Sequence, residues 1–269
     1  MKKIATIALA TTLTLGCAFT LTSCGENKDE LIVYTEAGFA PWEFTQKGST
    51  KVIGVDMEIA KYIANKYNYS LKVVNGSFDA IVAGIAEDNA LGIAGISYNA
   101  TRAEAVEYSN FYWGDAFQAV VYLKNGNPTL SDGAFAVSNF TGKSVVYQTG
   151  TTSQLTITEN QTAWGITDKT DFPQGLAALQ DMKADTSYGT YLIVDSQVAA
   201  QLVAENSDCG YAPIEGLDAE QYGIVAKKGN VELIAKVNAA LDELLQDDAN
   251  GKNQIEKWFE QYSAIQPEE

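Results

Sequence analysis

The sequence predicts an α/β fold with two small sheets. From Leu31 onward, short β-branched runs alternate with amphipathic stretches, which is typical of βα units around mostly parallel sheets. Two segments, Phe111–Asp115 and Glu220–Tyr222, have the aromatic and polar character of crossovers between lobes. Two crossovers indicate a middle lobe inserted into a discontinuous outer one. We therefore expect lobe 1 to comprise residues 31–116 and 221–269, and lobe 2 to comprise residues 117–220.

The N-terminal segment predicts secretion. Lys2 and Lys3 precede a long uncharged run that ends in small residues, as in secretory signal peptides. The run closes on Leu21–Cys24, which resembles the lipobox of bacterial lipoproteins, where cleavage precedes a lipid-bearing cysteine. We expect residues 1–23 to be a lipoprotein signal peptide, residues 24–30 a polar tether, and Cys24 the lipidated membrane anchor (diacylglycerol and palmitate). An ordinary cleaved signal or an uncleaved anchor helix are alternatives, because the run could span a bilayer.

Composition excludes several functions. The chain has 34 acidic and 18 basic residues and a formal net charge of −16, so nucleic acid and anionic lipid are not expected partners. It contains no histidine, which removes imidazole bases and histidine-containing metal sites, and we expect neither metal nor cofactor. With Cys17 in the signal peptide and Cys24 lipidated, Cys209 is the remaining thiol, expected to be a semi-buried packing residue in a turn.

Candidate strands follow the β-branched runs. They are Leu31–Tyr34, Leu71–Val74, Leu91–Ile96, Ala119–Leu123, Ser144–Tyr147, Tyr191–Val194 and Gly223–Ala226. These strands are enough for two small sheets.

Candidate helices lie between and after these strands. Apolar residues recur at helical spacing after Asp56, Ser77 and Asp195, which we expect at the helix starts, with Asp56 as an N-cap. Pro173 is expected at a first helical position. Two C-terminal helices are expected around Leu233–Leu244 and Ile255–Phe259.

Several segments in order resemble the polar amino-acid-binding class, family 3, of the periplasmic solute-binding proteins of ABC importers. They are Thr35–Phe44, Gly54–Ala60, Ala94–Arg102 with Tyr108–Tyr112, Thr141–Val145 with Gln148–Ser153, Ile193–Ser196 and Tyr222–Gly229. Each is weak alone, but together they cover nearly all of the chain after the signal. The resemblance implies a two-lobed, periplasmic-binding-protein-like (type II) fold with a ligand cleft between the lobes. It further implies capture of a free amino acid at the cell envelope, in the periplasm or outside the cell, and delivery to a permease and its ATPase.

A free amino acid presents a carboxylate, an ammonium group and a variable side chain. Arg102 suits the carboxylate, because a planar guanidinium donates two parallel charge-assisted hydrogen bonds. The resemblance gives it this role beside Ser97, with Thr152, at a helix start, offering backbone N–H groups from the other lobe. By helix spacing alone, Arg102 would instead be a solvated partner of Glu104 or Glu107.

Asp195 ends a strand and starts a helix, which is where ligands commonly bind in α/β sheets. The resemblance makes Asp195 the acceptor for the ammonium group, together with the carbonyl of Gly95. Asp195 could also be an N-cap, and one residue can fill both roles.

The resemblance places Phe39 and Phe78 around the ligand side chain and Glu36 and Gln148 at its distal end. Either ring could equally belong to the core. A carboxylate beside aromatic faces attracts a cation, which slightly favours arginine, lysine or ornithine over glutamine, whose amide the pair could also bind.

An enzyme on the same fold, similar to cyclohexadienyl or arogenate dehydratases, is the main alternative. Such an enzyme needs a proton donor in the cleft, and Glu36 is the only obvious candidate in a chain without histidine. We therefore expect a binding protein and no enzyme.

Overall fold

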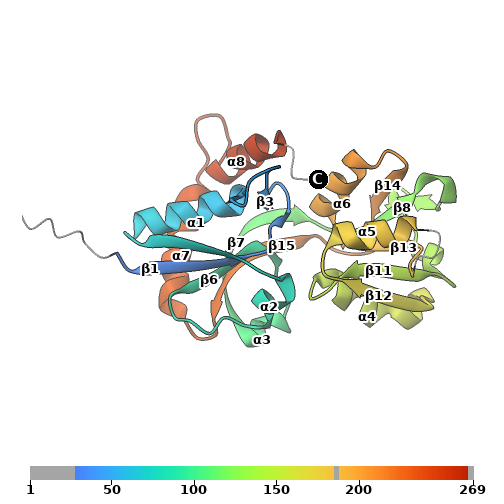
Figure 1. The fold of residues 1–269 in the computed structure, drawn as a ribbon, viewed down its shortest axis with the longest axis horizontal. Coiled ribbons are helices and arrows are strands. Elements are labelled where there is room, and N and C mark those ends of the chain that lie inside the picture. Colours follow the sequence, from blue (N-terminus) through green and yellow to red (C-terminus); the bar gives the residue numbers. More distant parts are fainter. Residues whose placement is uncertain (1–27, 185–187, 266–269) are drawn as a thin grey trace, which may run out of the picture.

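The computed structural model describes residues 28–184 and 188–265. The predicted signal peptide, Cys24 and most of the predicted tether lie outside the described residues. Within the described ranges, no helix is both long enough and apolar enough to cross a membrane. The described chain forms two lobes that lie side by side (Figure 1).

The first lobe is built on a five-stranded sheet in the order β5-β1-β6-β15-β7. Its strands are β1 (Glu30–Thr35), β5 (Ser70–Asn75), β6 (Ala90–Ser97), β7 (Val106–Ala116) and β15 (Glu220–Lys227). Strand β1 pairs in parallel with β5 and β6, whereas β15 runs antiparallel to β6 and β7. The short strands β2 (Gly38–Phe39), β3 (Glu43–Thr45) and β4 (Val52–Ile53) form a small sheet after β1.

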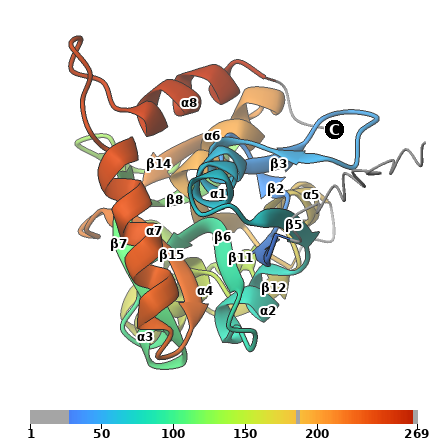
Figure 2. The same cartoon turned by 90° about the vertical axis from the view of Figure 1, so that its left-hand side faces the viewer.

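Five helices described in this lobe surround its sheet. They are α1 (Val55–Lys66), α2 (Phe78–Ala83), α3 (Arg102–Ala105), α7 (Val231–Leu244) and α8 (Gln254–Ser263). Helix α1 packs against α7 and α8, and α7 also packs on β7 (Figure 2). Helix α7 buries an apolar face with Leu233, Val237 and Leu241, so burial of this stripe fixes the helix on the lobe.

The second lobe repeats the same arrangement with a five-stranded sheet in the order β12-β11-β13-β8-β14. Its strands are β8 (Gln118–Leu123), β11 (Ser144–Gln148), β12 (Asp168–Phe172), β13 (Tyr191–Asp195) and β14 (Cys209–Pro213). Its helices are α4 (Thr152–Trp164), α5 (Gly175–Lys183) and α6 (Ser196–Glu205). Two short 3-10 turns, Lys124–Gly126 and Val137–Phe140, and the strand pair β9 (Leu130–Ser131) and β10 (Ala134–Phe135) complete it.

Two chain crossings join the lobes. One runs from β7 into β8 through Phe117, and the other runs from β14 to β15. An aromatic cluster supports β7 and β15 near these crossings, because the fully buried ring of Trp42 contacts Trp113 at 4.9 Å and Tyr222 at 5.3 Å between centroids. Offset and edge contacts of this kind add to the stability gained by burying the rings.

The structure confirms every candidate strand, but it corrects the expected sheet type. Each main sheet contains two parallel and two antiparallel pairings, so the prediction of mostly parallel sheets is wrong. The antiparallel pairings involve the strands next to the crossings, which enter each sheet from the other lobe. The segment Phe111–Asp115, expected as a crossover, lies within β7, and the crossing follows it.

Three local expectations change as well. Gly54 is the N-cap of α1, and Asp56 is buried instead, accepting hydrogen bonds from the Gly95 N–H and the Tyr112 hydroxyl. Helix α5 begins at Gly175, so Pro173 precedes the helix.

Cys209 is fully buried on β14, where burial raises the pKa of its thiol, and is not a semi-buried turn residue. The position of Asp195 at the start of α6 is confirmed, because it caps the helix by accepting a hydrogen bond from the Gln197 N–H.

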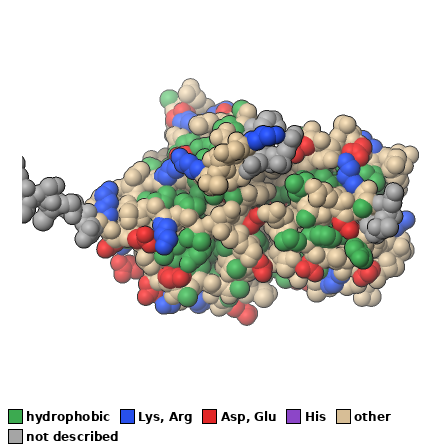
Figure 3. All heavy atoms as spheres, viewed as in Figure 1, with side chains coloured by type: hydrophobic (Ala, Val, Ile, Leu, Met, Phe, Trp, Pro, Cys, Tyr) green, Lys and Arg blue, Asp and Glu red, His purple; other side chains and the backbone are tan. Residues whose placement is uncertain are grey.

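The surface agrees with the acidic composition. On the face drawn in Figure 3, acidic and basic side chains are interspersed over both lobes, with hydrophobic side chains between them.

Candidate functional site

All the predicted ligand contacts line one cavity between the lobes. From the first lobe these are Glu36, Phe39, Phe78, Gly95, Ser97 and Arg102, and from the second lobe Gln148, Thr152 and Asp195. The structure therefore brings together residues that are spread over most of the chain. The cavity measures about 40 Å³, which is far below the volumes of several hundred Å³ that ligand pockets usually have. Admission of an amino acid therefore requires the lobes or the lining side chains to move.

Arg102 lies at one end of the cavity and is 7% exposed. Its guanidinium donates hydrogen bonds to the carbonyl of Ser97 at 2.9 Å and, across the cleft, to the carbonyl of Gly150 at 2.6 Å. The guanidinium carbon also lies 5.4 Å from the centroid of the Phe78 ring. Burial lowers the pKa of Arg102, and among the described residues it forms no ion pair. The arrangement contradicts the alternative of a solvated arginine paired with Glu104 or Glu107.

The hydroxyls of Ser97 and Thr152, two residues expected near the ligand carboxylate, converge on Glu220. Ser97 Oγ donates to Glu220 at 2.5 Å, and Thr152 Oγ1 donates to the same carboxylate oxygen at 3.0 Å. The amide of Gln118 donates to the other oxygen at 2.9 Å. Ser97 belongs to the first lobe and Thr152 and Gln118 to the second, so Glu220 links the lobes beside Arg102. Sequence reasoning missed Glu220 and Gln118 as site residues.

Asp195 lies in the cavity wall at the start of α6. One carboxylate oxygen accepts from the Gln197 N–H at 2.7 Å, and the other accepts from the Tyr222 hydroxyl at 2.7 Å. Removal of the carboxylate from water raises the pKa of Asp195 to about 7, although both hydrogen bonds favour the ionised form. A cation placed in the cavity would reverse this effect, so the group is suited to hold an ammonium ion.

The backbone of Gly95 lies close to the aromatic ring of Phe39. Its φ is +51° and a Cβ atom there would lie 2.1 Å from the Phe39 ring, so glycine is required for both conformation and space. The Phe39 ring is 8% exposed and contacts Tyr222 at 5.9 Å between centroids. Phe78 is partly buried and starts α2. The two rings thus form part of the core and also line the cavity.

Glu36 lies on the side of the cavity that adjoins a second hollow, which Arg102 does not line, and is 7% exposed. Its carboxylate accepts from the amide of Gln148 at 3.4 Å and from the amide of Gln174 at 3.2 Å, both from the second lobe. Burial raises the pKa of Glu36, while the two amide donors oppose the shift. Gln174 is the N-cap residue of α5, and no sequence pattern marked it as part of the site.

A third acid, Glu43, lines the cavity together with Glu36 and Asp195. Glu43 is 1% exposed and has one carboxylate oxygen without a hydrogen-bond partner. Burial and the neighbouring Asp56 hold the pKa of Glu43 well above its usual range, and burial raises the pKa of Asp56 to about 6. Asp56 in turn holds the Gly95 N–H at 2.9 Å, so this pair supports the backbone of the predicted ammonium site. No group of three or more acidic or cysteine side chains within residues 28–184 and 188–265 is arranged to hold a metal ion.

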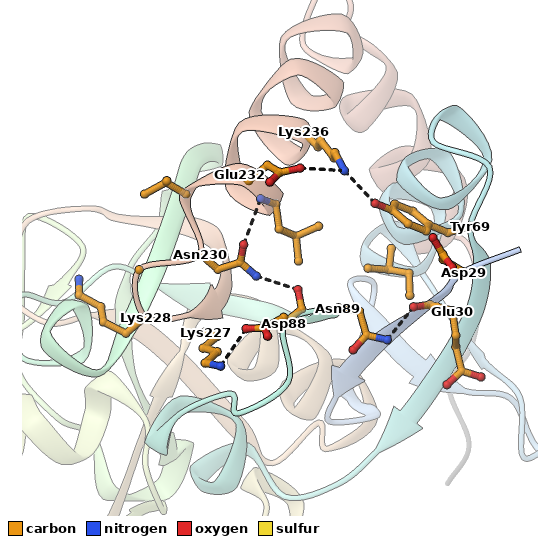
Figure 4. Close-up of a pocket in the computed structure, with 14 residues that line it drawn as sticks. Asp29, Glu30, Tyr69, Asp88, Asn89, Lys227, Lys228, Asn230, Glu232 and Lys236 are labelled. Atoms are coloured by element: carbon orange, nitrogen blue, oxygen red, sulfur yellow. Dashed lines mark hydrogen bonds and ion pairs between the residues drawn. The ribbon is translucent and has the colours of Figure 1, made fainter.

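A larger hollow of about 700 Å³ lies on the first lobe, lined by Glu30, Tyr69 and the turn between β15 and α7 (Figure 4). Several of its charged groups are already in ion pairs: Lys227 contacts Asp88 at 2.8 Å and Lys236 contacts Glu232 at 3.6 Å, while Lys228 and Glu30 pair with residues outside the hollow. It contains no residue of the second lobe. Its groups therefore do not converge on a common centre in the way that the interlobe residues do.

Comparison with known proteins agrees with this geometry. The profile of the bacterial extracellular solute-binding proteins, family 3, matches residues 31–261. The arginine-binding extracellular protein ArtP of Bacillus subtilis (strain 168) is 27% identical, over 96% of this chain and 98% of ArtP.

Two solved structures extend the likeness to the fold. The arginine-bound form of truncated ArgBP from T. maritima is 28% identical, with a TM-score of 0.69 over 80% of this chain and 96% of that one. An ancestral arginine-binding protein bound to glutamine is also 28% identical, with a TM-score of 0.72 over 87% and 98% of the two chains.

Proposed function

This chain belongs to the bacterial extracellular solute-binding proteins, family 3, and from that premise we propose that it captures an amino acid with a cationic side chain between its lobes. It then delivers this ligand to the permease of an ABC transporter. The observation that carries the proposal is the charge arrangement of the cavity. A buried guanidinium lies at one end, and the carboxylates of Glu36 and Asp195 lie along the remainder. A cationic amino acid has the complementary arrangement.

Each group of the ligand has a matching partner in this proposal. The ligand carboxylate binds Arg102 and takes the place of the Glu220 carboxylate at the Ser97 hydroxyl, with the first N–H groups of α4 at Thr152 beside it. The ligand ammonium binds Asp195 and the Gly95 carbonyl. The methylene chain lies between Phe39 and Phe78, and the distal cation reaches Glu36.

Ligand binding is coupled to lobe closure. Direct contacts already cross the cleft from Arg102 to Gly150 and from Glu36 to Gln148 and Gln174. A ligand between the lobes replaces these contacts with charge-assisted ones available only when both lobes are engaged, which favours the closed arrangement. The permease then recognises that arrangement.

Proteins of this family are substrate-binding proteins rather than enzymes, and we propose that this chain likewise catalyses no reaction. The candidate proton donor, Glu36, is held by two neutral amide donors. That environment suits a binding acceptor better than a general acid, which would transfer its proton to a substrate.

The lipid anchor at Cys24 remains part of the proposal. Expression of the full chain with an alkyne-tagged palmitate should label the wild type and should not label Cys24→Ala. Cys17→Ala and Cys209→Ala are matched controls that should retain the label. Labelling of Cys24→Ala would exclude Cys24 as the anchor without affecting the binding proposal.

Glutamine is the second candidate ligand. Glu36 already accepts hydrogen bonds from two glutamine amides, so a ligand amide could take the same position.

Isothermal titration of the purified, ligand-depleted protein with arginine, lysine, ornithine and glutamine tests these candidates. Binding of a cationic amino acid with at least tenfold preference over glutamine supports the main proposal. Preference for glutamine moves Glu36 to an amide-accepting role, and absence of binding to every amino acid overturns the proposal.

A further inference from the structure

A second hollow lies beyond the Glu36 end of the cavity. It measures about 130 Å³ and shares Glu36, Gly38, Gln148 and Val198 with the first cavity. The hydrogen bond from Gln148 to Glu36, at 3.4 Å, is therefore part of the boundary between the two spaces. We call the second space the distal chamber; it is further lined by Phe44, Gln174, Gln201, Leu202 and Glu205.

One face of α6 forms a wall of the distal chamber. Val198, Gln201, Leu202 and Glu205 recur at spacings of three and four residues, which places them on one side of the helix. Asp195 caps the same helix. Gln201 follows it by six positions, or about 9 Å along the axis at 1.5 Å per residue. A single helix thus carries the proposed ammonium acceptor at its start and the chamber wall farther along.

Gln201 has an unsatisfied acceptor. Its side-chain oxygen is shielded from water and has no hydrogen-bond partner within the described residues. A buried carbonyl oxygen without a donor is unfavourable, and native structures rarely keep one without a function or a missing partner. Gln201 lines both the distal chamber and a neighbouring hollow at Ala40 and Tyr262, and a donor supplied from the chamber would satisfy its oxygen.

The chamber also favours positive charge. Glu36 and Glu205 line it, and the lining residues include no lysine or arginine. Its acceptors are thus two carboxylates and one amide oxygen, distributed over both lobes. A planar guanidinium with its five N–H donors can serve several acceptors at once, whereas an ammonium group is a compact point charge.

We propose that the distal chamber receives the end of the ligand side chain and selects a guanidinium over an ammonium group. This inference rests on the proposed function, since it concerns the same ligand. When the ligand enters, Gln148 turns away from Glu36 and the two spaces join. The guanidinium then bonds to Glu36 on the first lobe and to the Gln201 oxygen on the second. Ornithine, which ends in an ammonium group on a shorter chain, reaches Glu36 but leaves the Gln201 oxygen without a donor.

Isothermal titration with arginine and ornithine tests the inference on wild type, Gln201→Leu and Gln201→Glu. Gln201→Leu keeps the size of the side chain but removes the acceptor, and should weaken arginine binding about tenfold or more, the loss typical of a hydrogen bond to a charged group. Ornithine binding should stay within about twofold of wild type. Gln201→Glu should strengthen arginine binding, because a carboxylate replaces the amide oxygen.

Gln197→Leu is the matched control, because Gln197 lies on the same helix and does not line the chamber. Gln197→Leu should change the affinity for neither arginine nor ornithine. Equal losses for arginine and ornithine in Gln201→Leu, or an unchanged arginine affinity, would overturn the chamber proposal. Weaker arginine binding in Gln201→Glu would do so as well. Wild type tests the proposed function separately: if it binds no amino acid, the proposed function fails. If it binds arginine normally and the Gln201 variants do too, only the chamber proposal fails.

Discussion

The two ends of the cavity differ in what surrounds their charged groups. At the Arg102 end, Ser97 and Thr152 hold a carboxylate from Glu220, and Tyr222 holds Asp195. At the Glu36 end, the partners are the neutral amides of Gln148 and Gln174, whose hydrogen bonds of 3.4 and 3.2 Å are longer than those of 2.5 to 3.0 Å at the Arg102 end. The first end thus presents a fixed pattern that any free amino acid would need, and the second presents side chains that can be rearranged. We infer that affinity depends mainly on the first end and ligand choice on the second.

Removal of the guanidinium tests the fixed end most severely. Arg102→Ala should weaken amino-acid binding about 30-fold or more, since loss of a buried, hydrogen-bonded charge partner costs about 2–5 kcal/mol. Arg102→Lys should recover only part of this, because an ammonium cannot make two parallel bonds to a carboxylate. Calorimetry on all three proteins gives the comparison. Full recovery by lysine would show that charge alone matters at this end.

Loss of the Asp195 charge should have the next largest effect. Asp195→Asn should weaken binding about 10- to 100-fold, the loss typical of a hydrogen bond to a charged group. With the pKa of Asp195 raised to about 7, wild-type affinity should also fall about tenfold per pH unit below pH 7, because the ligand ammonium needs the carboxylate. Affinity measured from pH 5 to 8 should be nearly flat for Asp195→Asn in this range. A parallel decline in both proteins would assign the pH effect to another group.

The same raised pKa has the opposite effect on stability. Between about pH 4 and pH 7 the folded protein keeps a proton on Asp195 that the unfolded chain has released, so acid favours the folded state. Without added ligand, the melting temperature of wild type relative to Asp195→Asn should therefore rise as pH falls from 7 to 5. A relative melting temperature that falls over this interval would contradict the raised pKa.

The rearrangeable end should respond selectively. Glu36→Gln should weaken binding of arginine about tenfold and leave glutamine binding within about twofold, because only the cation loses an ionic partner. Competition between the two amino acids in one titration series measures the ratio directly. If Glu36→Gln lowers the affinities for arginine and glutamine equally, the Glu36 end does not determine ligand choice.

Two glycine substitutions, one near each end, should differ in their effect on stability, and this is the smallest expected difference. Gly95→Ala forces a methyl group against the Phe39 ring at a positive φ and should lower the free energy of unfolding by about 1–3 kcal/mol. Gly38→Ala places its methyl group 2.9 Å from the flexible Glu36 carboxylate and should change stability by less than about 1 kcal/mol. Urea unfolding curves compare the two. A larger loss of stability in Gly38→Ala than in Gly95→Ala would contradict the assignment of the Arg102 end as the fixed one.

Sequence reasoning found the strands whose signal was strong and missed those without one. Most candidate strands are apolar and largely buried, whereas Leu71–Val74 lies in the exposed edge strand β5 and was marked by its β-branched residues alone. Strand β12, Asp168–Phe172, is polar and lies at a sheet edge, so burial left little pattern in it. Strand β14 contains glycine and proline at the edge of the same sheet, and these residues are typical of turns.

The site residues likewise divide into those that could be proposed from the sequence and those that could not. Arg102 and Asp195 could be proposed because the resemblance to the family assigned them roles, and the position of Asp195 between a strand and a helix agreed with this; helix spacing alone favoured a solvated Arg102. Gln174, Gln118 and Gln201 are neutral residues whose importance depends on which element faces them across the cleft, and the sequence does not encode that directly. Asp56 was misplaced because an acid at a helix start usually caps it, whereas here the side chain faces the core and Gly54 is the N-cap.

The position of β15 affects how the chain can be assembled. It lies between β6 and β7 in the first sheet, yet it follows every strand of the second sheet in the chain. During synthesis the second lobe can therefore complete its sheet while β6 and β7 still lack the strand that joins them. Such open edges can pair with other chains, and folding by domains exposes them for as long as the missing strand is delayed. Completion of the first lobe thus waits for residue 220, and a chain cut short before that point would retain one complete sheet and one with unpaired edges.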